Sequence, residues 1–249
     1  MKKVSDNLVI IPTYNEKENI SAMIDKVFSL DIPFDILIID DNSPDGTGSI
    51  VEQKKFQYPG RLHLINREEK MGLGTAYITG FKWALQNDYL YIFEMDADFS
   101  HNPEDLTRLF AACAYDGAEV AIGSRYVSGV NVVNWPIGRV LMSYFASKYV
   151  KIITGMKIHD TTAGFKCYKK EVLEAIQLDR IKFKGYAFQI EMKFTAWKLG
   201  FQLVEIPIIF TDRKAGYSKM SGGIFSEAAF GVIRMKLRSL FRNYNRAKK

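Results

Sequence analysis

Short runs of β-branched and other apolar residues alternate with segments of helical periodicity along the first half of the chain. The apolar runs predict strands at residues 8–11, 36–39, 62–65, 89–95 and 120–123. Helix-start signals recur between them, and the clearest is Asn102, followed by Pro103 at the first helical position and by the acidic residues Glu104 and Asp105. This βαβα alternation predicts an α/β fold, in which helices flank both faces of a Rossmann-like, mostly parallel sheet.

Polar clusters follow the first four predicted strands at the points where the strands end. These clusters are residues 12–16, residues 40–46, residues 67–74 and the pair Asp96 and Asp98. Ligands of open α/β sheets bind outside the carboxyl ends of the strands, so we expect the four clusters to form one site. Chance placement would scatter polar loops over both edges, and their common edge therefore favours a nucleotide-binding site.

Asp96 and Asp98 form the most informative pair. Side chains at positions i and i+2 of an extended strand point the same way, so both carboxylates can converge. Such oxygen ligands suit Mg²⁺ or Mn²⁺, and Mg²⁺ typically completes its shell with water and substrate phosphates. The pair therefore indicates a metal site for a nucleotide diphosphate. The alternative is a solvated turn with a capping aspartate.

Absent motifs separate this chain from other nucleotide-binding proteins. Residues 12–20 contain no glycine, so the GxGxxG fingerprint of dinucleotide enzymes is missing, and no GxxxxGK[ST] phosphate loop occurs. Gly72 and Gly74 precede a helix predicted over residues 75–85, where they form either a tight turn or a phosphate contact. Of the three histidines, only His101 lies near the aspartate pair in sequence.

Composition bounds the possible classes of protein. The 249 residues are 47% hydrophobic and 25% charged, which indicates a globular chain with a substantial core. No run of 18 apolar residues and no signal-peptide pattern occurs, so we expect a cytoplasmic location. Cys113 and Cys167 lack metal-ligand spacing and are expected to be buried and reduced. The net charge of +6 indicates an anionic partner, such as phosphate groups or an anionic membrane.

Seven motifs, in order, resemble the family 2 glycosyltransferases. They are IPTYNEKENI, IIDDNSPDGT, GLGTAY, MDADFSHNPEDL, GSRYVSG, DTTAGFKCY and FTDRKAGYSKMS. Within that family the chain is most similar to the polyprenol-phosphate (dolichol-phosphate) mannosyltransferases. The resemblance implies a GT-A fold and a metal-dependent, inverting enzyme that moves mannose from GDP-mannose onto a polyprenyl phosphate. Glucose remains the alternative sugar, and nucleic acid is not an expected partner.

The resemblance also assigns roles to individual residues. It places the nucleotide sugar against Pro12, Tyr14, Asn15 and Glu16, with Asp40 or Asp41 near the base and ribose, and it places the metal on Asp96 and Asp98. It brings Arg125 and Arg213 against phosphate groups, and Arg139 with Ser143 against the acceptor phosphate. Lys219 is expected to close over the diphosphate from a mobile loop that contains Gly216, Gly222 and Gly223. The implied catalytic residues are therefore Asp98, Arg125, Arg213 and Lys219. For each arginine, a surface ion pair is the alternative.

The chemistry of the implied acceptor requires no general base. A phosphate monoester has a second pKa of about 6 and is largely dianionic at neutral pH, so it can attack directly. Transfer to a hydroxyl would normally need a carboxylate or histidine base. A family 2 enzyme acting on a saccharide hydroxyl remains one alternative, and a catalytically silent nucleotide-sugar or lipid-binding protein remains another.

The second half of the chain contains two predicted amphipathic helices. Apolar positions recur at three- and four-residue spacing over residues 141–156, and again from Phe225 through Val232, Ile233, Leu237, Leu240 and Phe241. Residues 234–249 carry seven basic residues and no acidic one. We therefore expect a catalytic domain over 1–223 and a basic helix and tail over 224–249, peripherally attached to the cytoplasmic face of a membrane. Ordinary core packing with a solvated basic tail is the alternative.

Two departures limit the transfer of roles from the family. Ser100 stands where many members have a glutamine that can join the metal shell, so water is expected to fill that place. Lys166 stands where the family commonly has arginine, which weakens a bidentate phosphate role there. The predicted helix over residues 186–199, which carries Gln189 and Glu191, is expected to form part of the acceptor wall, with core packing as the alternative for Phe188, Met192 and Trp197.

Overall fold

The computed structural model describes residues 4–185, 187–212 and 223–244, except for the side chains of 223–229. The strands are β1 (Asn7–Thr13), β2 (Asp35–Asp40), β3 (Leu62–Asn66), β4 (Tyr91–Glu94), β5 (Val120–Ser124), β6 (Val132–Val133), β7 (Lys166–Lys169), β8 (Leu203–Pro207) and β9 (Phe210–Thr211). The helices are α1 (Ile20–Phe28), α2 (Thr47–Lys55), α3 (Leu73–Gln86), α4 (Asp105–Ala114), α5 (Ile137–Thr154), α6 (Lys170–Ala175), α7 (Ala187–Lys198) and α8 (Gly223–Phe241), with a 3₁₀ turn, η1 (Leu178–Arg180).

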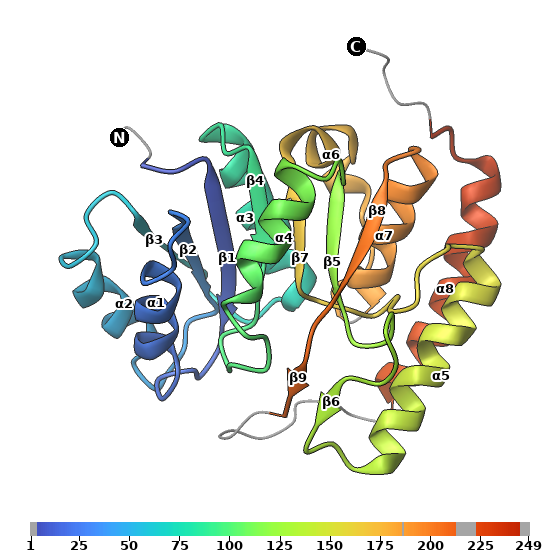
Figure 1. Ribbon diagram of the computed structural model, residues 1–249, viewed down its shortest axis with the longest axis horizontal. Coiled ribbons are helices and arrows are strands. Elements are labelled where there is room, and N and C mark those ends of the chain that lie inside the picture. Colours follow the sequence, from blue (N-terminus) through green and yellow to red (C-terminus); the bar gives the residue numbers. More distant parts are fainter. Residues whose placement is uncertain (1–3, 186, 213–222, 245–249) are drawn as a thin grey trace.

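A seven-stranded sheet in the order β3-β2-β1-β4-β7-β5-β8 forms the centre of the described structure (Figure 1). Its strands are parallel except β7, which runs antiparallel to both β4 and β5. The predicted mostly parallel α/β fold is therefore confirmed. A short parallel pair, β6 with β9, lies beyond the carboxyl ends of the parallel strands, at the lower edge in Figure 1.

The predicted element boundaries shift in three places. The strand predicted over 89–95 is only β4, because the amide of Tyr89 bonds the carbonyl of Ala84 and completes the turn after α3. The helix predicted from Pro103 begins at Asp105, because the preceding residues form a tighter turn in which the Asp105 amide bonds the Asn102 carbonyl. The helix predicted over 141–156 is α5, which begins four residues earlier and ends at Thr154.

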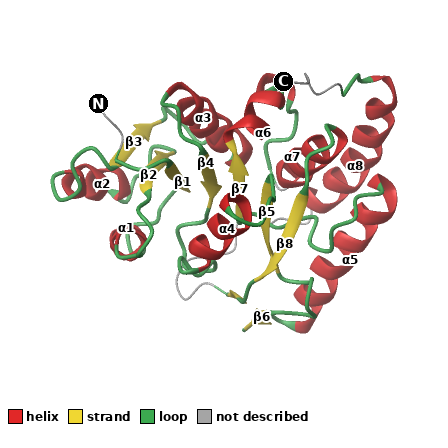
Figure 2. Cartoon of the chain, turned by 45° about the horizontal axis from the view of Figure 1, so that its top comes forward, coloured by secondary structure: helices red, strands yellow, loops and turns green. Residues whose placement is uncertain are grey.

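Both faces of the sheet are covered by helices, which explains the continuous apolar runs in its strands (Figure 2). Leu8 and Ile10 of β1 pack with residues of α3, α6 and α7 on one face. Val9 and Ile11 pack with residues of α1, α2 and α4 on the other. Full burial of such a side chain contributes about 1.5–3 kcal/mol, so the two layers fix the register of the central strands. Cys113 and Cys167 are free and buried, as predicted.

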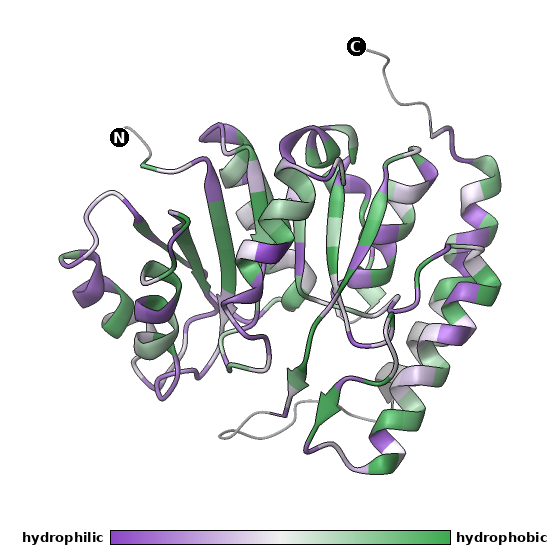
Figure 3. Cartoon of the chain, viewed as in Figure 1, coloured by the Kyte–Doolittle hydropathy of each residue, from purple (hydrophilic) through white to green (hydrophobic). Residues whose placement is uncertain are grey.

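Helices α5 and α8 lie side by side at the end of the sheet next to β8 (Figures 1 and 2). Two residues of the described part of α8, Val232 and Met235, belong to the core. Large apolar side chains elsewhere on the two helices are exposed; they are Ile137, Leu141, Met142, Phe145 and Ile152 on α5, and Phe230, Ile233, Leu237, Leu240 and Phe241 on α8. Green and purple segments alternate along both helices in Figure 3.

The predicted stripe on α8 is thus divided between the core and the surface. Val232 packs inward, whereas the other members whose side chains are described face outward at least in part; the Phe225 side chain lies outside the described set. In the described part of the chain, no helix has the length and hydropathy needed to cross a bilayer. The division at residue 223 remains a prediction.

Candidate functional site

The loops after β1 and β2 are bonded to each other at the carboxyl edge of the sheet. The backbone amides of Asn15 and Glu16 donate to the hydroxyls of Ser43 and Thr47, each at 3.0 Å. The amide of Lys17 donates to the Asp45 carboxylate, also at 3.0 Å. The structure therefore brings two of the predicted polar clusters together, and it does so through side chains of the second loop that hold the backbone of the first.

Asp40 and Asp41 are both buried and both hold loops. Asp40 accepts hydrogen bonds from the hydroxyls of Thr13 at 2.8 Å and Ser43 at 2.6 Å. Asp41 accepts a hydrogen bond of 2.6 Å from Nε of Arg67, whose Nη1 donates to the Thr75 hydroxyl. Burial raises the pKa of Asp41, although the Arg67 guanidinium opposes that shift. The two aspartates therefore fix the ends of β1, β2 and α3, and their contact with a nucleotide stays a prediction.

The remaining predicted donor residues line the first loop. Pro12 and Tyr14 are half-buried, and the ammonium of Lys70 lies 4.3 Å from the centre of the Tyr14 ring. The Glu16 carboxylate accepts a hydrogen bond of 3.2 Å from the side-chain amide of Asn19. An aromatic ring next to a lysine, beside buried carboxylates, can receive an anionic ligand that has a planar base.

Asp96 and Asp98 follow β4 on a bend rather than on the strand itself, because β4 ends at Glu94. Ala97 between them is only 4% exposed, whereas both aspartates are partly exposed, so the alternation expected of positions i and i+2 persists. The next residue, Phe99, has a φ of 59°, and the Ser100 amide donates to Asp98 at 3.1 Å. This turn directs the aspartate pair outward at the carboxyl edge.

The chemistry of this pair fits a hard divalent cation with an incomplete protein shell. Among the described residues, no three His, Cys, Asp or Glu side chains come together as a metal-binding group. The hydroxyl of Ser100 is buried and has no hydrogen-bond partner within the described structure. Mg²⁺ in phosphate-transfer sites typically takes one or two carboxylates and leaves its other positions to water and phosphate. The two aspartates therefore suit an ion that reaches the site with a diphosphate.

The buried side chain of His101 supports the turn formed by residues 96–100, called the aspartate turn below. Its ring is 3% exposed and stacks on Phe165 with the centroids 4.9 Å apart. Burial lowers the pKa of His101 to about 4, against the opposing charge of Asp98, so the imidazole is neutral. Its Nδ1 accepts a hydrogen bond of 3.3 Å from the Asp96 amide, which places the proton on Nε2. His101 therefore acts here as a positioning group for the turn.

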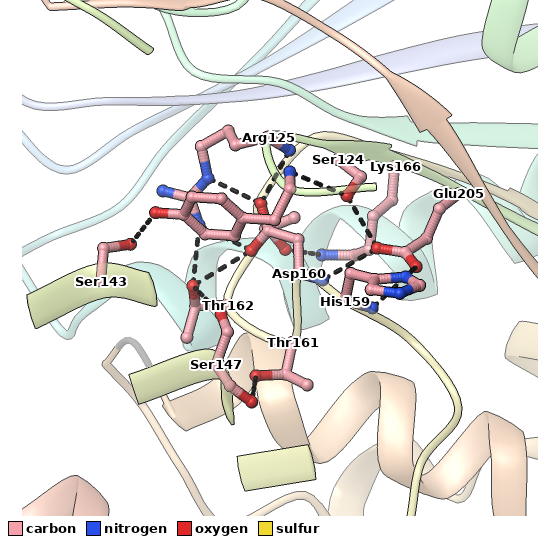
Figure 4. Close-up of polar contacts among 12 residues, drawn as sticks. Ser124, Arg125, Ser143, Ser147, His159, Asp160, Thr161, Thr162, Lys166 and Glu205 are labelled. Carbon is pink, nitrogen blue, oxygen red and sulfur yellow. Dashed lines mark hydrogen bonds and ion pairs between the residues drawn. The ribbon is translucent and has the colours of Figure 1, made fainter. Parts of the chain in front are cut away.

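Arg125, directly after β5, is held by a buried carboxylate (Figure 4). Its Nε and Nη2 donate to the two oxygens of Asp160, each at 2.7 Å, and its backbone amide adds a bond of 3.0 Å. Nη2 also donates to the Thr162 hydroxyl at 2.7 Å. Burial alone would raise the pKa of Asp160, but the Arg125 charge outweighs it and keeps that pKa below its usual value. The ion pair with Asp160 therefore fixes the position of the charged Arg125 guanidinium.

The three residues predicted for the acceptor phosphate converge around two aromatic rings. The guanidinium carbons of Arg139 and Arg125 lie 4.1 and 5.6 Å from the centre of the Trp135 ring. Ser143 accepts a 2.7 Å hydrogen bond from the Tyr126 hydroxyl, and the Tyr126 ring lies 5.1 Å from the Arg125 guanidinium. Arg139 also donates to Asp212 at 2.9 Å.

Phe210 of β9 lies between the aspartate turn and Arg125, which together with Arg139 is called the arginine group below. Its ring lies 5.6 Å from the Arg125 guanidinium and meets the edge of His101 at 5.3 Å between centroids. His101 in turn bonds the Asp96 backbone. The carboxylate pair and the arginine group therefore lie on two sides of one aromatic contact, as two neighbouring halves of a single site.

Lys166 and Gln189 lie beneath the site in a buried polar group. The Lys166 ammonium pairs with Glu94 at 3.0 Å and bonds Gln189, whose amide donates to Glu94 at 2.7 Å. Lys193 donates to the Ala163 carbonyl at 2.5 Å. Glu191 is also buried and accepts bonds from the amides of residues 182 and 183. Gln189 and Glu191 are thus engaged in interior hydrogen bonds, and the expectation that their helix forms part of the acceptor wall stays a prediction.

Two predicted residues, Arg213 and Lys219, lie outside the described part of the chain, as do Gly216 and Gly222. Five side chains that shape the site were not singled out from the sequence; they are Trp135, Asp160, Thr162, Glu205 and Phe210. The DTTAGFKCY motif contains two of them, and it is the signal that could have identified Asp160 as the partner of Arg125.

Residues 8–177 match the model of the family described as "Glycosyl transferase family 2". This match covers more than half of the chain. The chain belongs to glycosyl transferase family 2. The predicted family is therefore confirmed, and the aspartate turn and the arginine after β5 both fall inside the matched residues.

Two curated relatives of this family 2 glycosyltransferase are similar over almost its whole length. The chain is 47% identical over 231 residues to "Polyprenol monophosphomannose synthase" of Mycolicibacterium smegmatis, covering 93% of this chain and 87% of the relative. It is 45% identical over 230 residues to "Undecaprenyl-phosphate mannosyltransferase" of Micrococcus luteus, covering 92% of this chain and 93% of the relative.

Solved structures share the fold of the family 2 glycosyltransferase at low identity. A mannosyltransferase of Pyrobaculum calidifontis, in complex with GDP-Man and Mn²⁺, superposes with a TM-score of 0.59 at 16% identity, over 96% of this chain and 64% of that one. Glucosyl-3-phosphoglycerate synthase of Mycobacterium tuberculosis, in complex with Mn²⁺ and UDP, gives 0.64 at 16% identity, over 93% and 78%. The predicted GT-A arrangement of a mostly parallel sheet between helices is therefore confirmed.

Proposed function

We propose that this glycosyltransferase moves mannose from GDP-mannose onto a polyprenyl phosphate, with inversion at the sugar. The observation that carries the proposal is the pairing of two half-sites across Phe210, with carboxylates on one side and arginines on the other. The carboxylates suit a metal-bound diphosphate, and the arginines suit a second anion. The names of the two curated relatives support mannose as the sugar and a polyprenyl phosphate as the acceptor.

The donor half binds and orients the nucleotide sugar. Asp96 and Asp98 would hold Mg²⁺ or Mn²⁺, and the bound ion would neutralise charge on the leaving diphosphate. The solved relatives with Mn²⁺ support a divalent ion. His101 keeps the turn in place as a neutral ring, so it does not compete with the metal for the carboxylates. Arg213 and Lys219 are proposed to approach the same phosphates.

The acceptor half orients an incoming phosphate. We assign Arg125, Arg139 and Ser143 to this task, because they converge beside Trp135 and Tyr126. A phosphate dianion held there can attack the sugar opposite the departing diphosphate, which gives inversion. The carboxylates next to the arginines are poor general bases, since Asp160 is ion-paired with a lowered pKa and Asp212 is paired with Arg139. This observation favours a phosphate acceptor over a saccharide hydroxyl.

The first prediction concerns the donor and the acceptor together. Purified protein with Mn²⁺ and polyprenyl phosphate is expected to move radiolabel from GDP-mannose into the organic phase, and to use UDP-glucose at least about tenfold less well, which corresponds to 1.4 kcal/mol of discrimination. A free monosaccharide in place of the lipid phosphate serves as the acceptor control. Transfer to the sugar hydroxyl, or no transfer with either donor, would reject the proposal.

We further propose that the exposed faces of α5 and α8 lie on an anionic membrane at its cytoplasmic face. Both of these adjacent helices expose large apolar side chains at the end of the sheet, with Ile152 79% and Phe241 91% exposed. Arg234 and Arg238 are exposed on the same helix as Phe241. Apolar burial combined with attraction to anionic lipids is the mode by which interfacial helices bind.

The second prediction tests that surface. The double substitution Phe145→Ser and Ile152→Ser is expected to reduce co-flotation with vesicles containing anionic lipid by at least about fivefold, because two large side chains no longer enter the lipid. Phe56→Ser, at an 89% exposed site after α2, is the matched control and should float like the wild type. Equal loss in the control would place the membrane contact elsewhere, and binding that ignores both salt and anionic lipid would contradict the electrostatic part.

A further inference from the structure

Glu205, on the edge strand β8, bonds the residue before Arg125 and the backbone of the loop that carries Asp160, the partner of Arg125. Its side chain is 6% exposed. Oε1 accepts bonds from the Ser124 hydroxyl at 2.7 Å and the Asp160 amide at 2.8 Å. Oε2 lies 2.7 Å from the His159 amide and 2.8 Å from His159 Nδ1 (Figure 4). Glu205 thus joins the residue before Arg125 to the backbone next to the Asp160 carboxylate.

Residues 159–162 need such an anchor, because they form no strand or helix that would hold their backbone. Two consecutive amides of this loop, those of His159 and Asp160, donate to Glu205. The Asp160 side chain then holds both Nε and Nη2 of Arg125. A side chain that is ordered before binding loses less conformational entropy when a ligand arrives. The order of Arg125 therefore depends on where Glu205 holds the loop.

We propose that Glu205 is a positioning residue for acceptor binding: it fixes the backbone of His159 and Asp160, and thereby aims Arg125 at the acceptor phosphate. This inference rests on the proposed function, since it takes Arg125 as a phosphate-binding group. Glu205 itself touches no reacting atom in this scheme. It acts on the acceptor half of the site and leaves the aspartate turn, which follows β4 three strands away, unchanged.

Glutamine at this position cannot replace the carboxylate. Each oxygen of Glu205 accepts a backbone amide, one from His159 and one from Asp160. A backbone N–H can only donate, so the amide group of glutamine faces one donor with another in either orientation. Glu205→Gln therefore loses one of the two backbone bonds while it keeps the size of the side chain. This makes it a sharp test of the anchor.

The chain supplies a matched control on the same two strands. Glu119, just before β5, accepts a 2.8 Å bond from the Gln202 amide just before β8. Glu119 therefore joins the same pair of strands as Glu205, but at their amino ends, away from the arginine group. Glu119→Met removes the bond to the Gln202 amide, so it costs one backbone hydrogen bond at this pair of strands, as Glu205→Gln does. If Glu205 served only to hold β5 against β8, the two variants would have the same consequences.

The experiment measures the acceptor KM, kcat, the donor Kd in the presence of Mn²⁺ and the Tm for the wild type and both variants. Glu205→Gln is expected to raise the KM for polyprenyl phosphate by about tenfold, the effect of one lost hydrogen bond to a charged group, while the donor Kd changes by less than about twofold. Glu119→Met should leave all kinetic values at the wild-type level. An unchanged acceptor KM in folded Glu205→Gln, or an equal change in the donor Kd, would overturn the inference.

A second variant covers the case in which Glu205→Gln does not fold. Ser124→Ala removes one donor to Glu205, together with the long 3.3 Å bond that the Ser124 hydroxyl accepts from the Tyr126 amide. It should raise the acceptor KM by about threefold with the donor Kd unchanged. No change there would overturn the inference in that case. A wild type that transfers no sugar to any polyprenyl phosphate rejects the proposed function and this inference with it. An active wild type with unaffected variants rejects only the role of Glu205.

Discussion

Replacing Asp98 by asparagine is expected to lower transfer by at least about a thousandfold, because the variant removes a negative charge from the carboxylate pair that would hold the divalent ion. Asparagine keeps the size of the side chain and an oxygen that can accept the Ser100 amide, so the turn should persist. The transfer assay measures the loss of activity, and calorimetry of GDP-mannose binding with and without Mn²⁺ measures the loss of metal-dependent donor binding. The metal-dependent part of donor binding should disappear, and the Tm should stay within about 2 °C of the wild type.

Arg139→Ala is the matched comparison from the other half of the site. Arg139 stacks on Trp135 and pairs with Asp212, and neither contact involves the aspartate turn. Donor binding should therefore be unchanged by the substitution, and the KM for polyprenyl phosphate should rise. Should Asp98→Asn and Arg139→Ala reduce donor binding and acceptor use alike, the division of the site into two halves would be wrong.

The fold was predictable where burial follows from apolar runs. The strands β1, β2 and β5 are short apolar segments whose two faces are both covered, so the sequence pattern identifies them directly. β7 was not predictable in the same way. Its four residues begin and end with lysine, and its antiparallel direction follows from the loop after α5, which returns the chain to the carboxyl edge before the strand begins. No local pattern carries that information.

The site was predictable at the level of loops and less so at the level of partners. The carboxyl-edge rule correctly brought the loops after β1 and β2 together. It could not reveal that Arg125 is 9% exposed and paired with Asp160, because the two residues are 35 positions apart and each is an ordinary charged residue in sequence. Glu205 was missed for the same reason. Trp135 lies in a short segment without helical or strand periodicity, so nothing distinguished it from a surface aromatic residue.

Lys166 is a charged residue whose side chain is fully buried and paired with another buried charge. Its side chain and that of Glu94 are 0% exposed, and the 3.0 Å pair between them joins β7 to β4. Burial lowers the pKa of Lys166, and the Glu94 carboxylate opposes that shift. A buried ion pair adds little net stability over a well-packed apolar pair, but the removal of one partner leaves the other charge without compensation. The consequence of a single substitution should therefore be large and that of a double substitution small.

Lys166→Met is accordingly expected to lower the free energy of unfolding by about 3–5 kcal/mol, measured by urea denaturation. The double variant Glu94→Gln with Lys166→Met should regain most of that loss, since neither charge of this pair then remains without its partner. Lys170→Met is the matched control. Lys170 follows β7 directly and pairs with Asp88 at 2.7 Å, but the Asp88 side chain is 78% exposed, so its loss should change the free energy by less than about 1 kcal/mol. If Lys166→Met were as stable as this control, the buried charge of Glu94 would not depend on Lys166, and the interior of the site would be held by packing and by Gln189 and Lys193 alone.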